Sequence, residues 1–549
     1  RFGSPDTETH SRSVTTDPAG NVFTLGSFKG SVDFDPGPGV FILNSGTNIY
    51  GTSFICKLDS SGNFLWAGKM DISGVSIISD KNGNILVLGT YGGSVDVDPG
   101  PGAFDPGFGY AGSTCCVKLD NAGNFIWARA FIGGQSTAEP CRGSSICIDA
   151  TQHIYIGGSF AGATDFDPGP GSYKLTGYYQ PIPSRGSFPL PTFFICSLDS
   201  SGNFRFAKSR GAYNLGGITC TQQGEIFAYY TNYQSVGDIR DLIFTPKQIY
   251  IEKWDVNGNF LWSKVLKEAS PSGAFVFWPL VTPDRYGNIW LTGYFNGLID
   301  FDPSPANTWN LGTPTHSDTS LFILKLNTNG DFLHASHMHR AMGKPVLINK
   351  IFTDKQASLY LGGSFKGTFD FDLGPSTTTM NSVQTCGFFM KLDENFKFKW
   401  VGLIGENANS KVSSACQDNF GNFYISGSFS GTGDFDHGIA NSNLAAAGTE
   451  DAFLVKLSGP LITSIQSREL TESISFFPNP VTNLLNLNTD SEIKHGRYSV
   501  INIDGKIMLE NRDISGKDFK IDLSALQPGF YIVEILDEKY KARAKIIKD

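Results

Sequence analysis

NVFTLGSF, residues Asn21–Phe28, is an aliphatic run that ends in glycine and an aromatic residue. Six similar runs follow it, and the seven copies begin 63 to 72 residues apart. Self-similarity at a nearly constant spacing indicates a repeat architecture in which each copy is one supersecondary unit. The other copies are NILVLGTY from Asn84, HIYIGGSF from His153, EIFAYYTN from Glu225, NIWLTGYF from Asn288, SLYLGGSF from Ser358 and NFYISGSF from Asn422.

Each repeat contains three further strand signals in a fixed order. An apolar run such as GVSIISD (from Gly74) comes first, and runs of the types ICKLD (from Ile55) and NFLWAGKM (from Asn63) follow the glycine-ending run. Turns of the type D-x-x-G-N connect these runs, because Asp accepts hydrogen bonds from nearby backbone amides and Gly supplies a positive φ. Repeated units of four short antiparallel strands are typical of the blades of a β-propeller.

The aromatic run occurs six times, whereas the glycine-ending run occurs seven times. Arg1-Phe2-Gly3 resembles the tail of the aromatic run, and the last repeat stops at Leu457. The first residues are therefore expected to supply the outer strand of the last blade, which removes two open sheet edges. The sequence predicts an all-β fold with a seven-bladed β-propeller over residues 1–457, closed by the N-terminal strand. The chain would then begin inside a strand, and its true start is expected upstream.

The composition favours β-structure and limits the partners. The chain has 63 Gly, 44 Phe and 19 Tyr, with only 17% charged residues, which is typical of a protein rich in strands and turns. The net charge of -9 argues against a nucleic acid partner. No apolar run approaches the roughly 20 residues that cross a bilayer, so the chain is not expected to span a membrane.

A second domain is expected after the repeats. Residues 458–474 read as a polar linker, and residues 475–549 alternate apolar and polar residues at a period of two. Pro478-Asn479-Pro480, Asp504-Gly505 and Pro528-Gly529 supply the turns. This pattern predicts a small immunoglobulin-like β-sandwich of about seven strands.

Both domains resemble known families. The seven repeats, over roughly residues 1–460, resemble the bacterial β-propeller repeats called SBBP. Residues 475–549 resemble the type A C-terminal sorting domain of the type IX secretion system, through FPNP from Phe477, IDGK from Ile503, LSALQPGFYIVEI from Leu523 and a basic last strand. The residues that carry this second resemblance are Phe477, Pro478, Asn479, Pro480, Gly505, Lys506, Gly529, Tyr531 and Lys548.

The second resemblance implies a route and a partner. It implies export by a Bacteroidota-type bacterium, through the periplasm and the outer membrane, to the cell surface or the medium. The partner would be the outer-membrane machinery of type IX secretion, which residues 475–549 would contact. In this family the sorting domain is usually removed when the cargo is released or anchored.

DFDPGPG, Asp33–Gly39, is a further repeated motif with two interpretations. Two Asp at i and i+2 on a strand face the same side, and with loop carbonyls and water they could bind calcium. Alternatively, an Asp caps the turn, which leaves only the first Asp of each pair without an assigned role. We favour the turn, because the fourth repeat lacks the motif. The candidate calcium residues are Asp33, Asp35, Asp96, Asp98, Asp165, Asp167, Asp300, Asp302, Asp370, Asp372, Asp434 and Asp436.

No catalytic constellation is recognisable in the sequence. His337 and His339 would share one face of a strand, but a packing or surface role is favoured over a metal site. The less regular stretches Gly177–Phe194 and Ala228–Asp241 carry aromatic residues that suit binding of a glycan or a protein, or packing on their own blades. The sequence therefore predicts a secreted or surface-attached binding protein that is not an enzyme. The alternatives are a polysaccharide hydrolase or lyase that uses the propeller channel, and a passive cargo.

Overall fold

The computed structural model divides into two compact units, Arg1–Ser464 and Ile465–Asp549. In the part of the chain that the structure describes, every regular element is a β-strand. No helix suited to crossing a membrane occurs in this described part. The described residues are 1–46, 52–134, 139–182, 186–236, 243–268, 275–313, 319–338, 346–374, 376–436, 442–457, 474–502, 507–536 and 541–549, so the expected linker lies almost entirely outside them.

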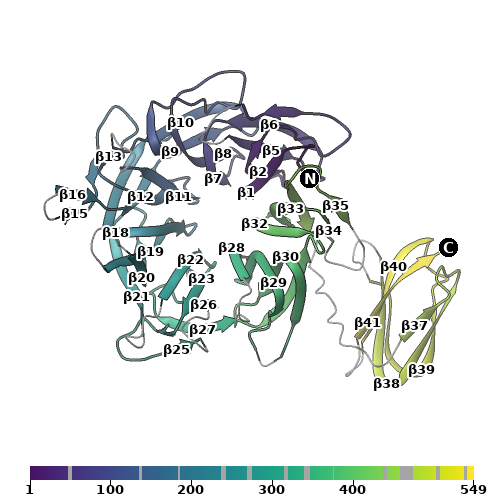
Figure 1. Ribbon diagram of the computed structural model, residues 1–549. Helices are drawn as coiled ribbons and strands as arrows, with labels where there is room; N and C mark the ends of the chain where they lie inside the picture. The colour runs from purple at the N-terminus through teal and green to yellow at the C-terminus, as the bar shows by residue number, and fades with distance from the viewer. Residues whose placement is uncertain are drawn as a thin grey trace. The chain divides into compact units, whose positions relative to one another are not determined.

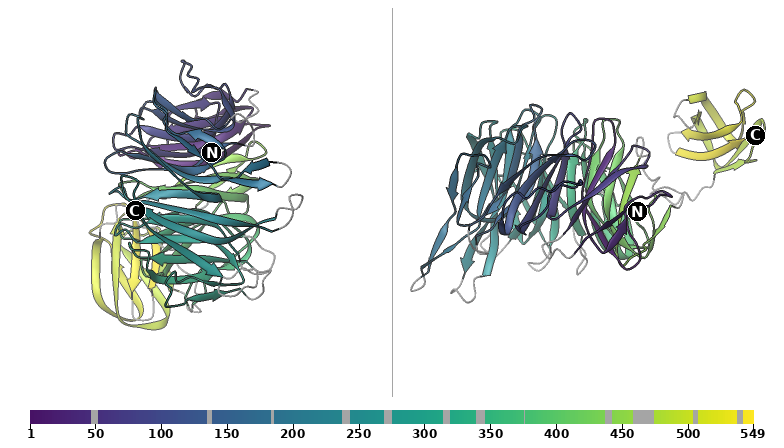
Figure 2. Two further views of the ribbon diagram at one scale, coloured as in Figure 1. Left: turned by 90° about the vertical axis from the view of Figure 1, so that its left-hand side faces the viewer. Right: turned by 90° about the horizontal axis from the view of Figure 1, so that it is seen from above.

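The first unit is a ring of seven antiparallel blades around a central opening (Figure 1), and Figure 2 shows the ring from two other sides. This confirms the predicted propeller. From the innermost strand outward, blade 1 consists of β1 (Glu8–Thr16), β2 (Val22–Lys29), β5 (Ser53–Leu58) and β6 (Phe64–Met70). Blade 2 consists of β7 (Ser73–Ser79), β8 (Ile85–Gly93), β9 (Gly109–Leu119) and β10 (Phe125–Phe131). Blade 3 consists of β11 (Cys141–Ile148), β12 (Ile154–Phe160), β17 (Thr192–Leu198) and the first part of β18 (Phe204–Cys220).

The remaining blades continue in the same order. Blade 4 consists of the second part of β18, β19 (Ile226–Val236), β20 (Ile243–Trp254) and β21 (Phe260–Glu268); blade 5 of β22 (Phe275–Pro283), β23 (Ile289–Asn296), β26 (Ser320–Leu326) and β27 (Phe332–Met338); blade 6 of β28 (Val346–Thr353), β29 (Leu359–Asp370), β30 (Thr379–Leu392) and β31 (Phe398–Ile404); and blade 7 of β32 (Asn409–Gln417), β33 (Phe423–Ser430) and β36 (Asp451–Leu457).

β18 differs from the expected pattern because it serves two blades. Its residues up to Ala212 pair with β17, and those from Tyr213 onward pair with β19. One continuous strand is therefore both the outer strand of blade 3 and the inner strand of blade 4. The sequence pattern predicted two separate strands here.

The first residues close the ring, as the sequence predicts. The amide of Phe2 donates to the carbonyl of Ala452 at 2.8 Å, and the amide of Ala452 donates back at 3.0 Å. Arg1 forms an ion pair with the buried Asp451 at 3.1 Å. The Phe2 side chain is 1% exposed and packs near the rings of Phe34 and Phe54. The first residues thus take the outer position of blade 7, through an isolated bridge between Phe2 and Ala452 and not a full strand.

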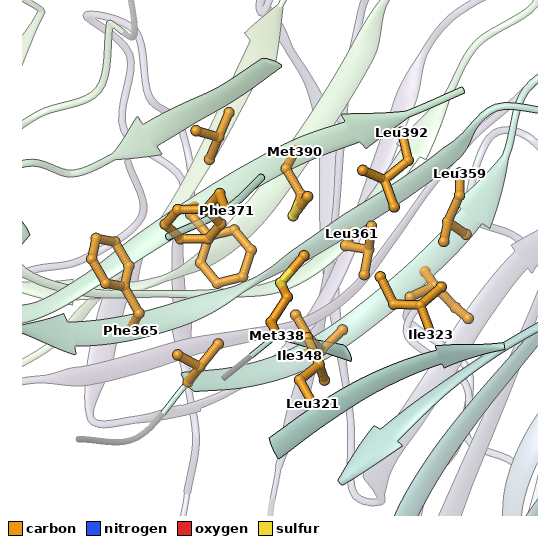
Figure 3. Packing of buried hydrophobic residues seen from close by; sticks show 14 of the residues in the cluster. Leu321, Ile323, Met338, Ile348, Leu359, Leu361, Phe365, Phe371, Met390 and Leu392 are labelled. Carbon is orange, nitrogen blue, oxygen red and sulfur yellow. The ribbon is translucent and has the colours of Figure 1, made fainter. Parts of the chain in front are cut away.

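Apolar side chains fill the space between neighbouring blades. Between blades 5 and 6, Leu321 and Met338 pack against Ile348, Leu361 and Met390 (Figure 3). The alternation in each strand places one face against each neighbour, so both faces of a blade are buried. The glycine-ending runs are almost entirely buried for this reason.

A lysine in the third strand joins most blades to the next one. Lys325 pairs with Asp284 of its own blade (Nζ to Oδ2, 3.6 Å) and lies 4.5 Å from the centre of the Trp290 ring. Its ammonium also donates to the carbonyl of Glu394 in blade 6 at 2.9 Å. The equivalent bonds to the next blade run from Lys57 to Asn121, from Lys118 to Ser200, from Lys253 to Thr328 and from Lys456 to Ser60.

Blade 3 makes this connection with a different residue. Ser197 occupies the lysine position of its third strand, and Arg205 on the following strand donates to the Ser197 hydroxyl at 2.8 Å. The other guanidinium nitrogen of Arg205 donates to the carbonyl of Val256 in blade 4 at 3.1 Å. A cation therefore bridges blades 3 and 4 although the lysine is absent.

The second unit contains five described strands. In spatial order they run β37, β38, β40, β41, with β39 paired to β38, and their core includes Leu485, Val500 and Val533. Its curled sheet agrees with the small β-sandwich predicted, but about seven strands were expected. β38 and β39 stay paired through register shifts after Asn488, so each bends where a break was expected. The strands are β37 (Ile474–Phe477), β38 (Leu484–Asn502), β39 (Ile507–Asp522), β40 (Gly529–Leu536) and β41 (Lys541–Lys548).

Replacing Lys325 tests the bridge between blades. Lys325→Met leaves the Asp284 carboxylate, whose side chain is 0% exposed, without its cation. Loss of one partner of a buried ion pair costs about 3 kcal/mol or more, so we expect the free energy of unfolding to fall by that order. Urea unfolding measures it, with Lys366→Met on the exposed face of β29 as the matched control. Equal midpoints for the two variants would contradict a structural role for the bridge.

Acid should weaken the propeller through the carboxylates beside these lysines. Burial alone would raise the pKa of Asp80, but its bonds from Asn84 and Lys118 outweigh burial and lower it. The pKa of Asp17 and of Asp354 is lowered by the same balance. A carboxylate with a lowered pKa stabilises the fold above the unfolded-state pKa of about 4, and this contribution is lost as the pH falls through the folded-state pKa. Urea midpoints should be constant from pH 7 to 5 and lower at pH 3; a flat profile would contradict this.

Candidate functional site

The repeated Asp pairs lie in a loop between the second and third strands of each blade that carries them. The first Asp of every pair closes this loop. Asp33 Oδ1 accepts the amide of Asp35 at 3.1 Å and that of Phe41 at 2.8 Å. The corresponding bonds occur at Asp96, Asp165, Asp300, Asp370 and Asp434.

The second Asp of the pair shapes the turn at the loop tip. Asp35 Oδ1 accepts the amide of Gly37 at 2.8 Å. Asp35 Oδ2 lies where a Cβ on Gly39 would be, at 2.2 Å, so only glycine fits at residue 39. Between the two carboxylates, Phe34 is fully buried against the blade. Each residue of the motif thus has a role in the loop, including the first Asp, whose role the turn interpretation had left open.

The twelve Asp do not come together into one site. The six pairs lie in six different blades, and the third pair, Asp165 and Asp167, borders a cavity of about 400 Å3 that Asp105 and Arg129 also line. Among the described residues, no group of three or more His, Cys, Asp or Glu side chains is arranged to hold a metal ion. Backbone amides already use Oδ1 of both residues in a pair such as Asp33 and Asp35. Calcium at these loops stays a prediction, which a substitution can test.

The histidines highlighted by the sequence lie in aromatic surroundings. His334 packs between the rings of Trp309 and Phe396, at 5.6 Å and 4.5 Å between ring centres, and burial lowers its pKa. His337 lies 5.9 Å from the ring of Phe295. His339 is outside the described residues. Of the two histidines considered as metal ligands, the structure describes only His337, and it lies against an aromatic ring.

Of the irregular stretches, the one after Gly177 is partly described. It forms a hairpin of β15 (Tyr179–Ile182) and β16 (Gly186–Pro189), with Tyr178 56% exposed just before it. Tyr179 is 41% exposed, and its hydroxyl lies 3.3 Å from Glu139. The second stretch, Ala228–Asp241, is described up to Val236 as part of β19.

The axis of the propeller holds a second cavity, which has a volume of about 300 Å3. The innermost strands of all seven blades line it. In Figure 1 these strands, β1, β7, β11, β18, β22, β28 and β32, surround the central opening. Of the two irregular stretches that the sequence offers for binding, Ala228–Asp241 contributes Tyr229 to this lining, and the first contributes none.

Every innermost strand carries a β-bulge, and the bulged residues of all but β18 and β22 line the cavity. A bulge inserts an extra residue and re-aims its side chain, and bulges are common beside binding sites. In β22 the bulge contains Trp278, which has a φ of 52° and is 56% exposed. In five other strands the single extra residue is Arg12, Val75, Ser144, Asn349 or Ser413.

The residue after the bulge connects neighbouring innermost strands. Ser145 Oγ accepts the amide of Ile218 at 2.7 Å, which joins blade 3 to blade 4. Ser13 accepts from Ile77, and Ser414 accepts from Val14, in the same way. Alignment of the first strand of each repeat could have shown this recurring serine. Its partner lies in the next repeat, however, so the bond itself cannot be read from the pattern.

The described residues of the sorting motif are distributed over β37, β40, β41 and the segment after β37. Asn479 Oδ1 accepts the amide of Ile547 at 2.8 Å, and the Tyr531 hydroxyl donates to the carbonyl of Gln527 at 2.8 Å. Lys548 is buried, and its ammonium donates to the carbonyl of Asp549. These contacts join the FPNP segment to the last strand. Gly505 and Lys506 lie outside the described residues; Phe477, Pro478, Pro480 and Gly529 lie within them.

Asp33 offers a test that separates loop closure from calcium binding. Asp33→Ala removes the acceptor of two amides and should lower the free energy of unfolding by about 1–2 kcal/mol. Asp33→Asn keeps an Oδ1 that can accept both bonds, so its melting temperature should stay close to that of the unsubstituted protein. EDTA should leave both unchanged. If calcium holds the loop, Asp33→Asn will melt as early as Asp33→Ala, and EDTA will lower the melting temperature of the unsubstituted protein.

Comparisons with known proteins bear on both units. Over 499 residues the chain is 22% identical to an uncharacterized WD repeat-containing protein of Acanthamoeba polyphaga mimivirus. The match covers 76% of this chain and 35% of that protein, so the chain spans about a third of the relative's length. The SBBP resemblance stays a prediction from the sequence.

Two solved structures are distant neighbours. Dimeric latent PorU from Porphyromonas gingivalis shares 8% identity at a TM-score of 0.12, over 99% of this chain and 34% of that chain. TcdA4 from Morganella morganii shares 10% identity at a TM-score of 0.20, over 87% of this chain and 22% of that chain. At these TM-scores neither structure bears on the fold.

The C-terminal unit has a direct family match. Residues 475–549 match the family model described as "Secretion system C-terminal sorting domain". The match covers the motif residues and the strand pairing described above. Residues 475–549 are therefore a C-terminal sorting domain of the type IX secretion system, which marks this propeller protein as a cargo secreted to the cell surface or the extracellular space.

Proposed function

We propose that the propeller is a binding module that type IX secretion delivers to the cell surface, and that the axial cavity is its binding site. The sorting domain accounts for delivery through contact with the secretion machinery. The propeller is the part that acts after delivery. The ligand we propose is a glycan of the cell surface or its surroundings.

The axial cavity is the observation that carries this proposal. Its volume of about 300 Å3 lies at the lower end of the range for small-molecule sites. Its wall combines apolar side chains, such as Val75 and Ile146, with hydroxyl and amide groups, such as Ser76 and Asn349. Apolar walls with a few placed polar groups are typical of ligand sites.

The geometry of the wall adds to this argument. Each innermost strand has a bulge, and in five of the seven strands the bulged residue lines the cavity. Trp278 keeps a positive φ, which costs on the order of 1–3 kcal/mol for a residue with a side chain. Strained backbone beside a cavity is a common property of ligand sites.

Filling the cavity tests the proposal. Val75→Trp places a large ring in the cavity wall, whereas Val383→Trp adds the same ring at a residue that is 85% exposed on β30. On a glycan array the unsubstituted full chain and Val383→Trp should bind the same glycans, and Val75→Trp should lose that binding while keeping its circular dichroism spectrum. Bound glycans should show no new reducing ends and no unsaturated products.

Two results would contradict this function. Equal glycan binding by the two tryptophan variants would remove the cavity as the site. Release of new reducing ends or unsaturated sugars by the unsubstituted chain would replace binding with hydrolysis or elimination.

A further inference from the structure

We infer that the axial cavity binds a small organic anion that carries several hydroxyl groups, such as an acidic monosaccharide, and that Lys350 and Arg12 bind its charged group. This inference rests on the proposed function, because it assigns a ligand class to the same cavity. Lys350 replaces a residue that four other blades share, whereas Arg12 lies at the bulge, where the residue differs between blades.

Lys350 replaces a residue that the other blades use for structure. It is the residue after the bulge in β28, opposite Gly362. Four blades have serine at this place, namely Ser13, Ser76, Ser145 and Ser414. A lysine cannot accept the amide that Ser13, Ser145 and Ser414 accept, so blade 6 lacks that bond to its neighbour.

The neighbouring residue replaces the missing bond. Asn349, the bulged residue itself, donates from Nδ2 to the carbonyl of Val412 in blade 7 at 2.7 Å. Blades 6 and 7 are therefore joined at the cavity without Lys350. The lysine has no part in this contact, and its charge needs another explanation.

Lys350 also differs from the lysines that bridge the blades. Those lysines have a carboxylate or carbonyl partner, as Lys325 has in Asp284 and Glu394. The structure records no hydrogen bond or ion pair for the Lys350 ammonium within the part of the chain it describes. Burial in the cavity wall lowers the pKa of Lys350, and the nearby Cys416 acts weakly in the opposite direction. A partly desolvated cation without a carboxylate partner is costly, and an anionic ligand would reduce that cost.

Arg12 supplies a second cation on the same cavity. It is the bulged residue of β1, its side chain is exposed, and no side-chain partner is recorded for it among the described residues. Blade 7 lies between β28 and β1, and Ser413, its bulged residue, also lines the cavity. The described lining residues include no aspartate or glutamate. Two cations on either side of one blade thus face a cavity whose described wall carries no opposite charge.

The rest of the wall suits hydroxyl groups on the ligand. Ser76, Ser144, Thr219 and Thr282 line the same cavity and can both donate and accept hydrogen bonds. A guanidinium group can hold a carboxylate with two parallel bonds. An inorganic anion would use the cations alone, whereas an acidic sugar would also use the hydroxyl groups. The cavity volume of about 300 Å3 suits one or two sugar rings better than a long chain.

Calorimetric titration of the full chain at fixed ionic strength tests the ligand class. The probes are galacturonate, the neutral sugar galactose and inorganic phosphate. We expect galacturonate to bind at least about tenfold more tightly than either of the others, since a charge-assisted hydrogen bond contributes about 1.5–3 kcal/mol.

The variants test the residues. Lys350→Ser restores the residue of four other blades and so should fold, and Lys350→Met keeps the side-chain volume if it does not. Either variant, and Arg12→Ser, should weaken galacturonate binding about tenfold or more, by the same charge-assisted contribution. Lys411→Ser is the matched control, because Lys411 is an exposed lysine of β32 that does not line the cavity.

The outcomes separate this inference from the proposed function. Galactose binding as tight as galacturonate, abolished by Val75→Trp, would overturn the anion class and leave the binding function intact. Phosphate binding as tight as galacturonate would overturn the requirement for hydroxyl groups. Unchanged galacturonate affinity in Lys350→Ser and Arg12→Ser would overturn the assignment of the residues. Absence of binding to all three probes, with array binding still lost in Val75→Trp, would also overturn the inference alone.

Discussion

The ring depends on a cation that most blades extend to the next. A propeller blade contacts only its neighbours, so the stability of the ring is the sum of its interfaces. Apolar side chains supply most of the buried area, but apolar contacts set neither the distance between neighbouring blades nor their relative orientation. Lys325, held by Asp284 and bonded to the carbonyl of Glu394, does both. Where the lysine is missing, Arg205 reaches the next blade instead, which indicates that the interface requires a cation at this place.

Repetition separates the charged residues that build the fold from those that have another purpose. The Asp pairs recur because each loop needs Oδ1 acceptors, and the bridging lysines recur because each interface needs a donor. A charged residue that breaks a repeated position has no such explanation. Lys350 is a residue of this kind, Arg12 lies at a bulge position that has no shared residue, and both line the cavity at the axis. A ring of identical repeats would line its axis with identical residues, so recognition of a specific ligand requires such departures.

The sequence predicted the elements well, because each is determined by residues close together in the chain. The glycine-ending runs, the D-x-x-G-N turns and the match of Phe2 to an outer strand all have this local character. The interactions it could not predict join residues about one repeat apart, such as Lys57 and Asn121. Nothing in the local pattern identifies the partner of Lys57. The continuity of β18 and the long bent strands β38 and β39 were missed for a related reason, since turn residues do not always break a paired strand.

The ring closes at blade 7, and the two cations that line the cavity lie in the blades on either side of it. Phe2 pairs with Ala452, so blade 7 is the one blade built from both ends of the propeller chain. Blades 6 and 1 flank it, and they carry Lys350 and Arg12. At the seam, Ser414 and Asn349 still join the innermost strands, while Arg1 and Asp451 join the outer ones. These contacts join the strands near the axis and the strands at the outer edge. The ring therefore does not need the two cations in order to close, and their charge is available to a ligand.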